Sequence, residues 1–212
     1  MEAATKKFYE KRGQVLVKNL QSRQFDAYYC DSKADALAKA LELIPKDSTV
    51  GWGGAMSAQQ IGLLDAVRSG EYHALDRDTC ATMEDRVKMM KKCLTADVFL
   101  TGANAISLDG QMVNIDGIGN RVAAIVYGPD SVIVIAGMNK VATDVPEALH
   151  RVRNIASPPN TVRLNKNTPC AVDGRCHDCY SPDCICNQVV ITRRSRAKDR
   201  IIVILVNDNL GF

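Results

Sequence analysis

Apolar residues in the first half of the chain alternate between helical spacing and short runs of strand length. Residues 2–24 place Leu16 and Leu20 on one helical face, and the run at 25–30 has the length of a strand. Further helices are predicted at 33–44, 58–69 and 83–94, and further strands at 49–52, 72–75 and 97–101. Strands that alternate with helices are typical of βα units, so we expect a mostly parallel sheet with helices packed on it.

The pattern changes in the second half, where short apolar segments are separated by turn residues. Segments 103–107 and 111–115 flank the dipeptide Asp109-Gly110, which is a strong hairpin signal. Two further strands are predicted at 121–127 and 131–136. Four short strands in succession indicate a β-meander after the βα units.

A cysteine-rich segment and a final strand complete the chain. A helix predicted at 145–156 should end before Pro158, because the residue ahead of a proline disfavours helical backbone. Residues 160–198 show little periodicity, whereas 199–206 are nearly all β-branched or aliphatic, as in a central strand buried on both faces. We therefore expect one α/β domain over 1–212, with a cysteine-rich insertion at 160–198 ahead of its last strand.

Composition and charge exclude several classes of protein. The 212 residues are 46% hydrophobic and 24% charged, as in an ordinary globular domain. No apolar run approaches the ~18 residues of a membrane span, and the first residues do not resemble a signal peptide, so we expect a cytoplasmic protein. The net charge is +3, and the run Arg193–Arg200 alone holds five basic residues and one acidic residue. Since the remainder is not basic, we do not expect binding to nucleic acid.

Five of the eight cysteines lie between Cys170 and Cys186. In a chain without a secretory signal, this density favours a metal or redox site over a disulfide framework. The spacing of Cys176 and Cys179 lets two thiolates reach one metal ion or one face of a cluster, and Cys184 adds a nearby thiol. Structural zinc more often uses two such pairs, so we favour a four-iron cluster, with zinc and an empty or disulfide-linked site as alternatives.

A glycine-rich turn between a predicted strand and a predicted helix is a candidate anion site. Gly53, Gly54 and Ser57 follow the strand at 49–52, and backbone N–H groups at such a turn can bind a phosphate or a carboxylate. The turn lacks the remainder of the dinucleotide fingerprint, so we expect an anion and not a dinucleotide. The alternative is a tight structural turn in which Trp52 fills the core.

Asn104, Asn120 and Arg121 are further candidate ligand-binding residues. Asparagine in such a region is most often a turn residue, but a guanidinium at the start of an apolar strand needs an anionic partner. That partner is either the same bound anion or a carboxylate such as Asp109 or Asp116. The sequence leaves both assignments open.

Three ordered blocks of the sequence resemble the LUD domain of lactate-utilisation proteins, namely Gly51–Ser57, Thr101–Pro129 and Val132–Lys140. The resemblance implies a NagB/RpiA/CoA-transferase-like fold and a role close to the oxidation of lactate or a related 2-hydroxy acid, beside iron–sulfur and flavin dehydrogenase partners. The cysteine segment resembles that of one subgroup of the family, in which Cys184 has no counterpart. This second resemblance implies four metal ligands, Cys170, Cys176, Cys179 and Cys186.

Two functional hypotheses follow. In the first, an iron–sulfur cluster passes electrons to or from a small organic anion or a partner dehydrogenase, and the anion binds at Gly53, Gly54, Ser57, Asn104, Asn120 and Arg121. In the second, the protein is a non-catalytic subunit or a ligand-sensing module with a structural zinc ion. No Ser-His or Cys-His pair and no glutamate marks a nucleophile, so the sequence leaves open whether the protein is an enzyme. A homo-oligomer is compatible with both.

Overall fold

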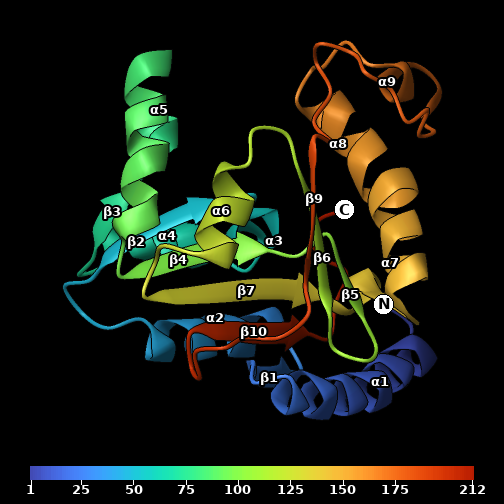
Figure 1. Ribbon diagram of the computed structural model, residues 1–212. Helices are drawn as coiled ribbons and strands as arrows, with labels where there is room; N and C mark the ends of the chain where they lie inside the picture. The colour runs from blue at the N-terminus through green and yellow to red at the C-terminus, as the bar shows by residue number, and fades with distance from the viewer.

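The computed structural model describes residues 1–212, and its centre is a six-stranded sheet (Figure 1). The strands lie in the order β1 (Asp26–Cys30), β10 (Ile201–Val206), β7 (Ser131–Gly137), β4 (Val98–Gly102), β2 (Thr49–Gly53) and β3 (His73–Leu75). Every neighbouring pair is parallel. The α/β class with a mostly parallel sheet, expected from the alternation of helices and strands, is confirmed.

Helices cover both faces of this sheet, which explains why its strands are continuously apolar. Alternate residues of β7 face two different cores, with Ile133 and Ile135 on one side and Val132 and Val134 on the other. The first core is closed by α2 (Lys33–Leu43), α3 (Met56–Gln60) and α4 (Leu63–Ser69), and the second by α1 (Ala3–Ser22) and α6 (Asn120–Val126). All residues of β10 are buried, as predicted for a strand covered on both faces.

Two predicted helices have different boundaries in the structure. The helix predicted at 58–69 is divided into α3 and α4, because Gly62 between them adopts a left-handed conformation with φ of +82°. Helix α5 (Met83–Lys92) lies between the short 3-10 helices η1 (Arg77–Thr79) and η2 (Cys93–Thr95). It extends away from the sheet, as Figure 1 shows.

A second, smaller sheet contains β8 (Val141–Ala142), β5 (Ala105–Ser107), β6 (Met112–Asp116) and β9 (Gln188–Thr192), in that order. The predicted hairpin is present, because β5 and β6 pair antiparallel. Strand β9 lies in the segment 160–198, which the sequence predicted to be irregular, and was therefore not expected. Its side chains alternate between half-buried and exposed positions, and the exposed ones include the apolar Val189 and Ile191, so no alternation of apolar and polar residues marks it.

The predicted β-meander is wrong, because the segment at 121–127 is the helix α6 and β7 belongs to the main sheet. Arg121, Val122, Ala124 and Ile125 are buried, which is the spacing of one helical face. A short apolar run fits a strand and a helix equally well, and here burial of this face against the main sheet selects the helix.

The helix predicted to end before Pro158 continues past it. Helix α7 (Val145–Arg151) runs through a π-helical turn, η4 (Val152–Ala156), into α8 (Ser157–Arg163). The π-helical turn changes the spacing of the backbone hydrogen bonds, and α8 begins directly after it. Pro158 therefore lies in the first turn of α8, where its missing N–H leaves no helical hydrogen bond unmade. Ser157 Oγ donates to the carbonyl of Val152 at 2.8 Å and stabilises this junction.

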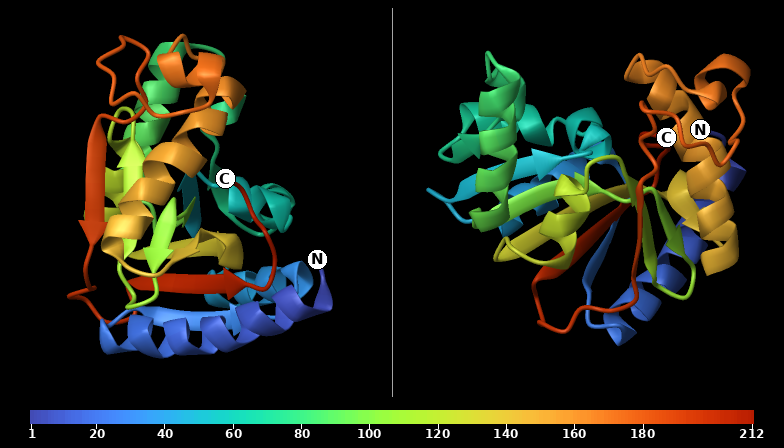
Figure 2. Two further views of the ribbon diagram at one scale, coloured as in Figure 1. Left: turned by 90° about the vertical axis from the view of Figure 1, so that its right-hand side faces the viewer. Right: turned by 45° about the horizontal axis from the view of Figure 1, so that its top comes forward.

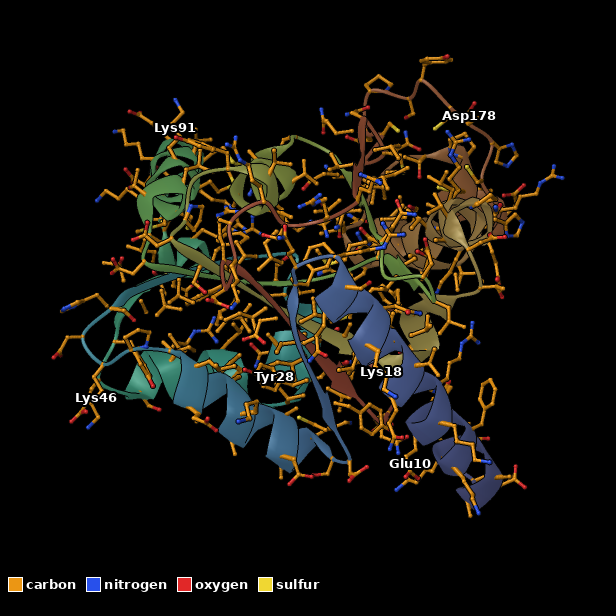
Figure 3. All side chains as sticks on the ribbon, turned by 60° about the horizontal axis from the view of Figure 1, so that its bottom comes forward. Glu10, Lys18, Tyr28, Lys46, Lys91 and Asp178 are labelled. Carbon is orange, nitrogen blue, oxygen red and sulfur yellow. The ribbon has the colours of Figure 1, made fainter.

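The segment at 160–198 comprises the end of α8, the short helix α9 (Pro169–Asp173), an irregular loop that bears most of the clustered cysteines, and β9. Figure 2 shows α7 and α8 beside the second sheet, with the loop and α9 at their end. In Figure 3, Asp178 on this loop and Lys91 on α5 lie at two separate edges of the molecule. No helix has the length and apolar character needed to cross a membrane.

Candidate functional site

The carboxyl ends of β2, β4 and β7, which are neighbours in the parallel sheet, meet at one cleft. The cleft has a volume of about 520 Å³, and α6, α8 and the region around α5 contribute to its walls. Open α/β sheets bind their ligands beyond the carboxyl ends of the strands. The cleft therefore has the position expected of a substrate site.

The glycine-rich turn lies at the base of this cleft. Gly54 lines the cleft and has φ of +57°. A Cβ at this position would lie only 2.6 Å from Cδ of Arg121, so a glycine is required for the Arg121 side chain to pack against the turn. Gly53 and Ser57 are buried directly behind the wall. Since α3 has only five residues, the polar group offered here is the Ser57 hydroxyl and not the end of a long helix.

Arg121 is buried, and protein acceptors take all of its N–H groups. Nε forms an ion pair with Asp116 at 3.2 Å, Nη1 donates to Asn114 Oδ1 at 3.0 Å, and Nη2 donates to Asn104 Oδ1 at 2.9 Å. The carbonyls of Gly102 and Ile115 accept from the two remaining N–H groups. Of the two partners considered from the sequence, the structure thus contains the Asp116 carboxylate, and a direct contact of Arg121 with a bound anion stays a prediction.

Asn104 and Asn120 both line the cleft, but they differ in their surroundings. Asn104 Oδ1 accepts from Arg121 and from the backbone N–H of Ile115 at 3.0 Å, so this side chain connects β6 to α6. Asn120 is the first residue of α6, with its amide nitrogen close to Gly53. The cleft therefore brings together four of the predicted residues, Gly54, Asn104, Asn120 and Arg121. Their contacts with a ligand stay a prediction.

Lys140 is a candidate that the sequence motifs did not single out. It ends the 3-10 helix η3 (Met138–Lys140), directly after β7, and it is only 5% exposed. Its Nζ donates to Ser57 Oγ at 3.1 Å. Burial, and then the positive charges of Arg151 and Arg121, lower the pKa of Lys140 to about 7. A lysine directly behind a buried parallel strand is the signal that could have indicated it.

The remaining charges give the cleft an excess of positive charge. Its lining holds five cationic side chains and two acidic side chains. Arg121 is paired with Asp116, and Arg86 is paired with Asp78 at 2.8 Å. Three basic residues without a carboxylate partner remain, namely Arg77, Lys140 and Arg163. Arg77 also has a buried Nε that lacks any hydrogen-bond partner. A small anion would complete this arrangement.

A second cavity, of about 200 Å³, is lined by all five clustered cysteines. Every cysteine in the chain is a free thiol. Cys176 Sγ accepts from the backbone N–H of Asp178 at 3.5 Å, and Cys184 Sγ accepts from that of Cys186 at 3.4 Å. Backbone N–H donors to sulfur stabilise the thiolate form that a metal requires.

The other thiols lie in more enclosed surroundings. Cys170 Sγ is 3.3 Å from the Thr168 hydroxyl and 3.5 Å from that of Thr161. Burial raises the pKa of Cys186 to about 11, with further contributions from neighbouring cysteines. His177 pairs with Asp173 at 2.8 Å.

The cysteine cavity has the donor chemistry of a thiolate metal site, but its side chains are not gathered around one point. No group of three or more histidine, cysteine or acidic side chains is placed to hold a metal ion. The donor set nevertheless fits a cluster, because five thiols share one cavity and two of them already accept N–H groups. The ligand set Cys170, Cys176, Cys179 and Cys186 remains a prediction.

The cleft and the cysteine cavity share a wall. Ile115 of β6, Ser157 of α8 and Ile185, in the loop between two cysteines, line both spaces. Two apolar side chains and one small hydroxyl thus separate the cationic cleft from the thiols. No spacing in the sequence indicated this proximity, because it depends on how α8 and the cysteine loop pack against the second sheet.

The open parallel sheet, with a cationic cleft at its carboxyl edge, defines an α/β protein whose candidate functional site is this cleft. The chain belongs to the LUD domain family, which it matches over residues 13–206. The resemblance found in the three sequence blocks is therefore confirmed.

One solved structure of similar extent agrees with this assignment at the level of the fold. A DUF162 family protein from Deinococcus radiodurans is similar over 93% of this chain and 98% of that chain, with a TM-score of 0.53 and 13% identity. Ribose 5-phosphate isomerase A from Neisseria gonorrhoeae aligns over 53% of this chain and 54% of that chain, with a TM-score of 0.34 and 19% identity. No curated protein matches the sequence significantly.

Proposed function

We propose that this LUD-family protein is of the lactate-utilisation type, binding a small carboxylic acid of the 2-hydroxy or 2-oxo class in the cleft and a four-iron cluster in the cysteine cavity. It would act in 2-hydroxy-acid oxidation or a related electron transfer. The single observation that supports this most is the shared wall of Ile115, Ser157 and Ile185, which brings an anion site and a set of redox-capable thiols together.

The anion is supported by the charge of the cleft. Arg77 is half-buried, has no carboxylate partner, and has a buried Nε without any partner. Buried or half-buried cations without counter-charges are costly, and a bound carboxylate removes that cost. The paired Arg121 holds Asn104 and Asp116 in place and so shapes the wall that the ligand contacts.

The cluster would be held by Cys170, Cys176, Cys179 and Cys186, with Cys184 as the alternative fourth ligand. When bound, a four-iron cluster supplies one-electron redox chemistry. The chain's own contribution is an apolar wall that excludes water on the cleft side and backbone N–H groups that stabilise the thiolates.

A partner dehydrogenase is supported by an exposed surface on α6 and β9. Val126 is 59% exposed, Tyr127 is 85% exposed and Ile191 is 42% exposed. These apolar side chains border the same hollow as Arg193 and Arg196. An apolar patch edged by positive charge suits an acidic partner surface, and a second copy of this chain is the competing occupant.

Calorimetric titration of anaerobically prepared protein with pyruvate and lactate tests the anion site. We expect binding of both acids, no binding of the uncharged analogue hydroxyacetone, and no tight binding of NAD. Arg77→Met should weaken binding roughly tenfold, the loss of one charge-assisted hydrogen bond. The control Lys91→Met, on the exposed side of α5, should bind as the wild type does. Equal binding of hydroxyacetone and pyruvate, or tight NAD binding, would refute the proposal.

A second candidate function is a ligand-sensing or non-catalytic subunit with a structural zinc ion. The cysteine loop leads directly into β9 and is fixed to β6, because the backbone N–H of Asn187 donates to the Asp116 carbonyl at 2.9 Å. A metal in the loop would then stabilise the second sheet. Zinc without iron in anaerobic protein, with lower thermal stability after chelation, would favour this function.

A further inference from the structure

The amine of Lys140 lies where three strand ends converge. Lys140 follows β7, Ser57 follows β2, and Gly102 ends β4. Nζ is hydrogen-bonded to Ser57 Oγ at 3.1 Å. Lys140 also lines the cleft, so its side chain reaches from the buried sheet edge to the ligand space.

Two glycines keep the space around this amine open. A Cβ at Gly102 would lie 3.7 Å from Nζ, and a Cβ at Gly211 would lie 3.2 Å from Nζ and 3.4 Å from Ser57 Oγ. A side chain at Gly211 would crowd the amine, whereas a Cβ at Gly102 would make an ordinary contact with it. The absence of side chains at these positions leaves room for a small molecule to reach the amine.

The charges around Lys140 disfavour its protonated form. Arg121 and Arg151 are the charged neighbours that act on it, and both are cationic. The Asp116 carboxylate is engaged by Arg121, and the Arg151 donors go to the backbone oxygens of Asn104, Asn139 and Phe212. A buried lysine usually has a carboxylate partner, and Lys140 has only a hydroxyl.

We propose that Lys140 binds the carbonyl of a 2-oxo acid covalently, as an imine. The proposal rests on the proposed anion site and deepens it, because it names the substrate class as one with a ketone beside a carboxylate. The neutral amine attacks the C2 carbonyl carbon, and a new C–N bond forms. The two amine protons and the carbonyl oxygen leave together as water, so the step needs no oxidant or reductant, and hydrolysis reverses it.

Other residues of the cleft suit this step. A pKa of about 7 for Lys140 makes the amine nucleophilic at neutral pH, unlike an ordinary lysine. Ser57 Oγ can relay a proton to the departing oxygen. Arg77 lines the same cleft and has no carboxylate partner, so its guanidinium is available to a ligand carboxylate.

Reductive trapping tests the proposal. The full-length protein is incubated with pyruvate and sodium cyanoborohydride near neutral pH, digested and mapped by mass spectrometry. We expect a reduced pyruvate adduct on Lys140 that forms at least about tenfold faster than on the exposed Lys88, because an amine of lower pKa has a far larger neutral fraction. Lys88 is an internal control, since it is ion-paired with Glu84 on the surface of α5.

The outcomes separate this proposal from the anion site. Calorimetric binding of pyruvate without an adduct on Lys140 would overturn the imine and leave the anion site intact. Absence of both binding and adduct would overturn both. In Lys140→Arg, which retains the charge, we expect the adduct to disappear; because mapping of the wild type is decisive by itself, a folding defect of this variant does not affect the test.

Discussion

At the scale of single residues, two buried cations of the cleft differ in the number of their partners. Arg121 donates to five acceptors, whereas Lys140 donates to one hydroxyl. The sequence indicated that Arg121 needs a partner, but the choice between Asp116 and a ligand depends on how α6 lies against β6. The only sequence signal for Lys140 is its position directly behind the apolar strand β7, and exposed lysines that follow strands share that position.

Arg121→Lys should destabilise the protein. A lysine keeps the charge but cannot reach all five acceptors, so Asn104 and Asn114 lose buried partners, at a cost of about 2–4 kcal/mol in the free energy of unfolding. Urea unfolding followed by circular dichroism measures this. Arg23→Lys is the control, because Arg23 pairs with Asp109 at 2.6 Å in a more exposed position and should lose at most about 1 kcal/mol. Unchanged stability together with lost affinity for pyruvate would instead make Arg121 a ligand-binding residue.

Lys140 should make folding stability depend on pH. Burial lowers its pKa from 10.5 to about 7 in the folded protein, so between these values the unfolded chain binds more protons than the folded one. The free energy of unfolding should therefore rise with pH in this window, by at most about 1.4 kcal/mol per pH unit relative to Lys140→Met. Comparing the two proteins from pH 6 to 9 cancels the contributions of the thiols. Parallel stability curves would show that Lys140 has an ordinary pKa.

At the scale of elements, the sequence predicted the helices and strands in which the pattern of apolar residues directly reflects their burial. The strands of the main sheet are apolar on both faces, and the helices packed on them show a clear stripe. Strand β9 and helix α6 were missed or misassigned, since β9 exposes Val189 and Ile191 and α6 is a short apolar run. The continuation through Pro158 depends on a π-turn, which no local residue pattern encodes.

Gly54→Ala should weaken the contact between the glycine-rich turn and α6. The residue has φ of +57°, and the added Cβ would lie 2.6 Å from Arg121 Cδ, so both backbone strain and a clash oppose it. We expect a loss of about 2–4 kcal/mol in thermal or urea unfolding. Gly174→Ala is a matched control, with φ of +78° and nothing within 4 Å, and should lose only about 1 kcal/mol. Equal losses would mean that the clash is relieved by movement of Arg121.

Serine substitutions in the cysteine segment should lower the metal content of anaerobically prepared protein. A hydroxyl is a much weaker donor than a thiolate, so Cys170→Ser, Cys176→Ser, Cys179→Ser and Cys186→Ser should each lose most of the iron. Elemental analysis measures this, and Cys80→Ser, outside the cavity, is the control. Cys184→Ser should be the mildest change in the segment. A larger loss there than for Cys186→Ser would make Cys184 the fourth ligand.

At the scale of the whole molecule, two sites that are separate in the sequence become neighbours. The glycine-rich turn and the cysteine segment were both recognised from their residues. Their proximity arises because α8 and the cysteine loop pack beside the second sheet, which brings Ser157 and Ile185 to the wall between them. The family likeness indicated a class of function, whereas the geometry indicates how a bound acid and a cluster would influence each other.

The electron paramagnetic resonance spectrum of anaerobically prepared, dithionite-reduced protein, recorded with and without saturating pyruvate, tests the central claim most directly. We expect an iron–sulfur signal whose line shape changes when pyruvate binds, because only a thin wall separates the two sites. Arg77→Met at the same pyruvate concentration should change less. A protein without iron, or a signal that stays the same at saturating pyruvate, would contradict the claim that the cleft and the cysteine cavity form one functional unit.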